Sequence, residues 1–169
     1  MGNDFVKPIG VLTAICLIVS LALAATYQIT KPIIDANRQA KEDAAIAAVL
    51  PAADTFEKIT ENLPEGVAEV YKAANGSGIV AKVATPGYKG NVEMMIGVNS
   101  EGKIEGIQTV SHSETQGLGT KALDEAYISQ FYGSDNSGVE AIVGATRTSN
   151  AVKGNVDKAL AAYNAVKEG

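Results

Sequence analysis

Hydrophobic and polar residues follow one pattern in the first part of the chain and another after it. No charged residue occurs between Pro8 and Thr30, and residues 9–25 are mostly Ile, Val, Leu and Ala. As a helix, residues 8–30 would extend about 34 Å, enough to cross the hydrocarbon core of a bilayer. The pattern therefore predicts a transmembrane helix over residues 8–30, behind a tail of residues 1–7.

A cleaved signal peptide is the alternative interpretation, because Ala22-Leu23-Ala24 resembles a cleavage site. Lys7 is the only basic side chain before the span, whereas a signal peptide usually has a more basic N-terminal region. This favours an uncleaved anchor. After the span come the basic residues Lys31, Arg38 and Lys41. This distribution slightly favours a cytoplasmic location for the globular part, but acidic residues are interspersed and the count leaves orientation open.

The next segment predicts a stalk over residues 31–59. Lys31-Pro32 should break the first helix locally, since an internal proline removes a hydrogen-bond donor. Residues 33–50 then read as a second, alanine-rich helix that Pro51 ends. A plain surface helix is nearly as good an interpretation.

From Gly66 onward the hydrophobic period changes to two, which is typical of half-buried strands. Hairpin turns are indicated by Asn75-Gly76-Ser77-Gly78 and Asn99-Ser100-Glu101-Gly102. The predicted antiparallel strands are Val67–Ala73, Ile79–Ala84, Val92–Val98 and Ile104–Val110, with Val139–Val143 as a candidate fifth.

Two helical patterns complete the chain, at residues 121–131 and 149–166. The second carries apolar residues at three-to-four spacing, a face that can pack on the sheet. The expected fold is therefore α+β: a domain over residues 60–169 behind the anchor and stalk.

Composition narrows the chemistry. A net charge of −5 argues against nucleic-acid binding, which needs a concentrated basic face. Cys16 is the only cysteine and lies in the apolar span, while His112 is the only histidine. Neither a metal site nor a nucleophilic catalytic group is predicted.

Two polar, glycine-containing loops are candidates for one ligand site. The first is His112-Ser113-Glu114-Thr115-Gln116-Gly117-Leu118-Gly119, where glycines let backbone N–H groups approach a ligand. The second, Gly144-Ala145-Thr146-Arg147-Thr148-Ser149, opens a helix whose positive end favours a phosphate. Each alone is a weak signal: the first could be a simple turn, and the second an ordinary helix start with Ser149 as N-cap.

Together the two loops resemble the FMN-binding domain of the G subunit of the Rnf electron-transport complex, shared with the C subunit of the sodium-pumping NADH:quinone reductase. The family pattern is His-x-Glu-Thr-Pro-Gly-Leu-Gly, then Asp-x-x-Ser/Thr-Gly-Ala-Thr-x-Thr-Ser. The order, the spacing, the preceding strands and the N-terminal span agree, so the resemblance covers nearly the whole chain.

The resemblance implies that FMN is joined through its phosphate to Thr146. Thr148 and Ser149 would then bind phosphate oxygens, and Leu118 would contact the ring. The residues implied to line the cofactor are Glu114, Thr115, Gly117, Leu118, Gly119, Gly144, Ala145, Thr148 and Ser149.

This sequence departs from the family pattern at three positions. Gln116 replaces Pro, Glu140 replaces Asp, and Val143 stands where Ser or Thr is common. The last two lie in the region that the flavin transferase reads. Attachment of FMN is still expected.

The function implied by the resemblance is a membrane-anchored electron carrier within an ion-translocating ferredoxin:NAD⁺ oxidoreductase. Its partners would be the other Rnf subunits, the flavin transferase and membrane lipid. The family places the domain on the extracytoplasmic side, against the charge count. A stand-alone extracytoplasmic electron shuttle, the quinone-reductase C subunit and a non-redox binding module are the alternatives.

Overall fold

The computed structural model describes residues 3–61, 63–134, 136 and 138–168, and the chain divides into two units, residues 1–40 and 41–169. Helix α1 (Asn3–Val49) contains Pro8 and Pro32 without interruption, so the predicted break at Lys31-Pro32 is wrong. The proline removes one hydrogen bond, but the turns on either side keep theirs. Its stretch Pro8–Val49 is long and apolar enough to cross a membrane.

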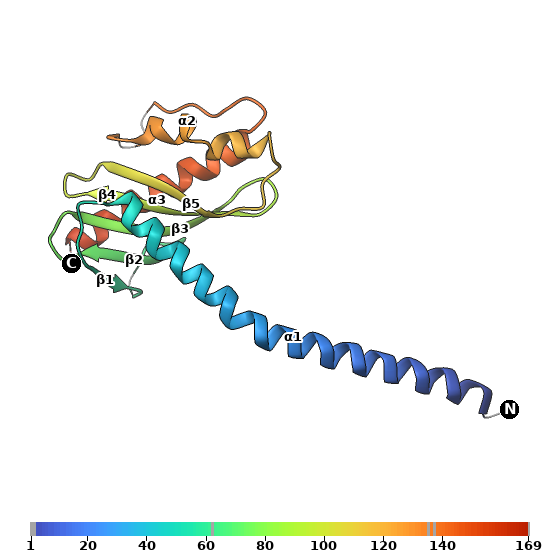
Figure 1. Cartoon of the computed structure of the whole chain (residues 1–169). Coiled ribbons are helices and arrows are strands. Elements are labelled where there is room, and N and C mark those ends of the chain that lie inside the picture. Colours follow the sequence, from blue (N-terminus) through green and yellow to red (C-terminus); the bar gives the residue numbers. More distant parts are fainter. Residues whose placement is uncertain (1–2, 62, 135, 137, 169) are drawn as a thin grey trace. The chain divides into compact units, whose positions relative to one another are not determined.

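Five strands form one antiparallel sheet in the order β1-β2-β3-β4-β5 (Figure 1). All four main predicted strands are confirmed, and the α+β fold with them. The observed strands are β1 (Phe56–Ile59), β2 (Val67–Ala73), β3 (Gly78–Pro86), β4 (Asn91–Asn99) and β5 (Ile104–Ser111). The turn before β5 closes as expected, with the Gly102 N–H donating to the Asn99 carbonyl at 2.9 Å.

The fifth strand is β1, so the candidate strand Val139–Val143 is wrong. In that segment, backbone groups bond to side chains of the following helix instead of to a neighbouring strand. The Ile142 N–H donates to Ser149 Oγ, and the Val139 carbonyl accepts from Lys153 Nζ.

The helical region after the sheet also differs from expectation. In place of one helix over residues 121–131, residues 119–131 form three short pieces: η1 (Gly119–Leu123), α2 (Glu125–Ile128) and η2 (Ser129–Phe131). Asp124 is extended, which interrupts one continuous helix, and its carbonyl accepts the N–H groups of Tyr127 and Ile128. The last helix, α3 (Thr146–Glu168), begins earlier than predicted, so Ser149 lies inside its first turn and is not the N-cap.

Both faces of the sheet are buried. Helix α3 covers one face, where Val83, Met94 and Ile96 pack against Val152 and Val156. Residues 41–50, which are the last turns of α1 and the following Leu50, cover the other face. The members of this second cluster are Ala45, Ile46, Val49, Leu50, Tyr71, Ala73, Val80 and Met95. Residues 41–50, which the sequence suggested were stalk, therefore pack as part of the sheet domain.

A pair of glycines makes the contact with α1 close. Gly97 and Gly106 lie opposite each other on β4 and β5, and the backbone of Val49 sits against both. A Cβ added at Gly106 would lie 2.8 Å from Val49 Cα, and one at Gly97 would overlap the Val49 carbonyl oxygen. The absence of side chains at this pair is what lets α1 approach the sheet.

We expect Gly97→Ala to lower the free energy of unfolding of the full chain by about 1–3 kcal/mol, because backbone must move to admit the methyl group. Urea unfolding in detergent, followed by circular dichroism, measures this change. Gly90→Ala is the control, since its Cβ would make only an ordinary 3.6 Å contact with Ser113. Equal stability of the two variants would contradict the close approach of α1.

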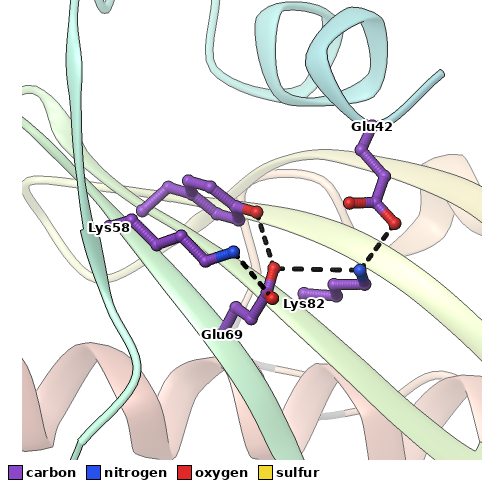
Figure 2. A network of polar contacts seen from close by, with 5 residues as sticks. Glu42, Lys58, Glu69 and Lys82 are labelled. Carbon is purple, nitrogen blue, oxygen red and sulfur yellow. Dashed lines mark hydrogen bonds and ion pairs between the residues drawn. The ribbon is translucent and has the colours of Figure 1, made fainter. Parts of the chain in front are cut away.

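A network of charges joins the end of α1 to three strands (Figure 2). Lys82 Nζ lies 2.6 Å from Glu42 Oε1 and 3.8 Å from Glu69 Oε2, and Lys58 Nζ lies 2.8 Å from Glu69 Oε1. The Tyr71 hydroxyl donates to Glu69 Oε2 at 2.6 Å. Burial and this hydrogen bond raise the pKa of Tyr71, so it remains a neutral donor.

Candidate functional site

A cleft of about 340 Å³ lies where three loops meet. One loop is the β3–β4 hairpin turn at residues 87–90, the second follows β5, and the third leads into α3. Its lining residues are Tyr88, Glu114, Thr115, Leu118, Gly119, Gly144, Ala145, Thr146, Arg147 and Thr148. The structure thus brings together the two loops that the sequence indicated, although about 25 residues separate them.

The third loop presents Thr146 at the start of a long helix. Gly144 has φ +85°, a conformation that favours glycine, and the next N–H, that of Ala145, donates to the Ile142 carbonyl at 3.0 Å. The turn so formed leads directly into α3, whose first residue, Thr146, is exposed in the cleft. A hydroxyl at this point lies in the positive field of a 23-residue helix.

Glu114 joins all three loops from beneath the cleft. Its Oε2 accepts from the Thr148 hydroxyl at 2.7 Å, and its Oε1 accepts the N–H groups of Tyr88 and Lys89 at 2.9 and 3.2 Å. The side chain is buried, and a Cβ at Gly119 would lie 2.5 Å from Oε2. Gly119 therefore supplies the space that this carboxylate occupies.

The carboxyl of Glu114 is held in its charged form. Burial raises the pKa of Glu114, but the hydrogen bonds from Thr148, Lys89 and Tyr88 outweigh burial and leave the pKa below its ordinary value. A charged, fully engaged carboxylate is suited to fixing loop positions rather than to transferring protons.

The second loop is held by its own backbone. The Thr115 carbonyl accepts the N–H groups of Leu118 and Thr120, and the Gly117 N–H donates to Thr120 Oγ1 at 2.9 Å. Gly117 has φ +74°, which turns the loop so that Leu118 is half-exposed over the cleft. Leu118 also lies close to Gly144, and so supplies an apolar wall beside Thr146.

Eight of the ten predicted site residues line the cleft, and two do not. Gly117 lies behind the loop that it shapes. Ser149 is fully buried, and its hydroxyl accepts from the Ile142 N–H. Thr148 lines the cleft, but its hydroxyl donates to Glu114.

Sequence reasoning missed Tyr88. Its side chain is 63% exposed at the rim of the cleft, on the hairpin turn that bonds to Glu114. The available signal was an aromatic residue inside Gly87-Tyr88-Lys89-Gly90, a turn where a large exposed ring has no packing role. Nothing in the sequence pairs this turn with the other two loops.

Glu114→Gln is expected to lower the free energy of unfolding at pH 7 by about 1–3 kcal/mol, because the amide cannot accept at every contact. The lowered pKa means that the carboxylate stabilises the folded state above the ordinary value of 4.5, and that this contribution disappears as the pH falls through the lowered pKa. The difference in free energy of unfolding between wild type and Glu114→Gln should therefore become smaller below about pH 4.5. Urea unfolding from pH 7 to pH 3 measures it, with exposed Glu101→Gln as control. A difference independent of pH would contradict a charged Glu114.

Comparison with known proteins gives the context of this cleft. Residues 87–161 match the family described as FMN-binding domain, a range that contains all three loops. The chain is 30% identical to the G subunit of the proton-translocating ferredoxin:NAD(+) oxidoreductase complex of Clostridium ljungdahlii, over 88% of this chain and 86% of that protein.

The chain belongs to the family of G subunits of ion-translocating oxidoreductase complexes. Two further members of the family show the same extent of similarity. The G subunit of the Na(+)-translocating ferredoxin:NAD(+) oxidoreductase complex of Acetobacterium woodii is 29% identical, over 90% of this chain and 88% of that protein. The G subunit of the ion-translocating oxidoreductase complex of Methanosarcina acetivorans is 28% identical, over 89% and 90%. In this chain the matched FMN-binding domain begins at the turn between β3 and β4 and ends within α3.

Proposed function

We propose that this chain carries FMN as a phosphoester on Thr146 and relays electrons within an Rnf-type ferredoxin:NAD⁺ oxidoreductase complex. The observation that supports it best is the exposed Thr146 hydroxyl at the N-terminus of α3, inside the cleft of the FMN-binding domain. The linkage is formally a condensation: the Thr146 oxygen bonds to the phosphate of FMN, and one water is lost.

The chemistry of the cleft fits such a group. Leu118, Ala145 and the ring of Tyr88 offer apolar surface of the kind that a flat aromatic ring system needs. Beside this apolar surface, the first N–H groups of α3 and the Arg147 side chain favour a phosphate. Glu114 holds the three loops together, so the two kinds of surface stay in fixed relation.

The chain contributes position rather than reaction chemistry. FMN accepts and donates electrons at its ring system, and the protein determines where that ring is held. A covalent link on Thr146 keeps the cofactor at high effective concentration near its redox partners without exchange into solution. The partners that we propose are the other subunits of the complex, and the transferase that matures this one.

For a transferase, the attachment segment must be accessible. Glu140 and Val143, the two departures from the family pattern in this segment, are both exposed, and Val143 is 98% exposed. Neither substitution therefore disturbs packing around Thr146, and we expect attachment to proceed.

We propose that α1 anchors the chain in the membrane and that the domain lies on the extracytoplasmic side. An Asn75→Cys variant, made in a Cys16→Ala background, tests on which side of the membrane the domain lies, because Asn75 is exposed on a turn of the domain. A membrane-impermeant maleimide should label it on intact cells. Labelling only after lysis would place the domain in the cytoplasm.

Trypsin digestion and mass spectrometry test the attachment. Protein expressed with the transferase should show an intact-mass increase equal to FMN minus one water. Trypsin cuts after Arg147, so the flavin should appear on peptide 122–147 and not on peptide 148–153, which carries Thr148 and Ser149. An unmodified intact mass from a host that carries the transferase would contradict the covalent flavin.

Purification tests the complex. The subunit should co-purify with several polytopic membrane proteins when isolated in mild detergent from its native host. Isolation as a single flavinylated protein would instead favour a stand-alone electron shuttle.

A further inference from the structure

Arg147 occupies an unusual place for a cation. It is the second residue of α3, where the helix dipole repels positive charge, and the first turn of α3 contains no acidic residue. Arg147 is exposed and lines the cleft beside Thr146. On local grounds an uncharged residue would suit this position better, so a compensating anion is expected nearby.

The described part of the protein does not provide that anion. Among the described residues, no carboxylate forms an ion pair with Arg147. Glu114 is the buried acid of the cleft wall, and its two oxygens already accept from Thr148, Tyr88 and Lys89. Among the residues that the structure describes, the charge of Arg147 therefore lies at the cleft without a balancing acidic side chain.

The hydroxyl groups that sequence assigned to phosphate binding are engaged elsewhere. Thr148 donates its hydroxyl proton to Glu114, and Ser149 Oγ is buried against the Ile142 N–H. Neither hydroxyl proton of this pair is presented to a phosphate beside Thr146. The donors that remain at this end of the cleft are the guanidinium of Arg147 and the first backbone N–H groups of α3.

We propose that Arg147 is a positioning residue that neutralises the flavin phosphate on Thr146. This inference rests on the proposed function. A phosphate esterified on both sides keeps one negative charge, and the planar guanidinium offers several N–H donors to its free oxygens. Arg147 thereby fixes the orientation of the phosphate, and with it the direction in which the flavin leaves α3.

A thermal-stability cycle on the full chain in detergent tests the proposal. Wild type, Arg147→Gln and Arg147→Lys are each prepared with and without the transferase, and their melting temperatures are followed by far-ultraviolet circular dichroism. Without flavin, Arg147→Gln should be as stable as wild type or more stable, because a cation leaves the positive end of α3. The gain in melting temperature on flavin attachment should be smaller in Arg147→Gln by about 4 °C.

Three comparisons decide the result. Arg147→Lys should retain most of the gain, and Lys121→Gln, which removes a charge outside the cleft, should retain all of it. Equal gains in wild type and Arg147→Gln, with flavin attached to both, would overturn the role of Arg147 and leave the proposed function intact. No mass increase in wild type would overturn the proposed function and the role of Arg147 with it.

Discussion

Thr146→Ala is expected to abolish covalent flavin attachment and leave the fold unchanged. The exposed side chain makes no packing contribution to α3, and alanine is a strong helix former, so stability should not fall. The hydroxyl oxygen is the atom that would bond to the phosphate, so its removal leaves no acceptor. Intact mass and in-gel flavin fluorescence measure the loss, and circular dichroism verifies the fold.

Thr146→Ser is the matched control, because it keeps the hydroxyl at the first position of α3. It should retain attachment, at a reduced rate, while Thr60→Ala, at an exposed position outside the cleft, should leave attachment at wild-type levels. Flavin fluorescence that persists in Thr146→Ala would show that another hydroxyl is the acceptor. In that case the cleft would still bind flavin, but Thr146 would not be the attachment point.

Removal of residues 41–50 is expected to unfold the domain. The side chains of Ile46, Val49 and Leu50 are buried against the sheet, and burial of each contributes about 1.5–3 kcal/mol. Their combined loss, about 4.5–9 kcal/mol, approaches the whole stability of a typical domain, about 5–15 kcal/mol. The truncation also leaves Lys82, only 13% exposed, without its partner Glu42.

Two fragments make the comparison direct. A fragment of residues 41–169 keeps the whole compact unit and should be a folded monomer by gel filtration and circular dichroism. A fragment of residues 51–169 retains all five strands and α3 but should aggregate or lack cooperative melting. Similar melting temperatures for the two fragments would show that the end of α1 contributes little.

The strands were predictable because their period of two is local and β2 to β5 are joined by short connections. The packing of residues 41–50 on the sheet was not predictable from sequence. An alanine-rich helical pattern is the same whether the helix lies in solvent or packs on a sheet. The decisive signal was outside that segment, in the glycines at 97 and 106, which are informative only when their cross-strand pairing is known. Likewise β1, with four residues, is too short for its period to stand out.

At the site, the order of the two motifs in the sequence identified the two loops. The hydrogen-bond partners of the individual hydroxyl groups were not predicted correctly. Thr148 and Ser149 are polar residues beside Thr146, and only the three-dimensional structure shows that they bond to Glu114 and Ile142. Helical geometry explains the case of Thr148, which is two residues from Thr146 and lies on another side of α3. Ser149 is three residues from Thr146 and shares its side of the helix, but it is buried against the Ile142 N–H. Adjacent positions in a motif need not serve the same ligand.

The position of α3 also determines when the cleft can exist during biosynthesis. The cleft depends on the Thr148–Glu114 hydrogen bond, which spans 34 positions, and α3 docks through Lys158, whose ammonium group reaches the Ala84 carbonyl 74 positions earlier. Helix α3 leaves the ribosome after all five strands, so the pocket cannot close until α3 has been synthesised. A maturation enzyme that recognises the assembled pocket therefore acts only after α3 has docked, and a nascent chain that stalls before α3 would never become its substrate.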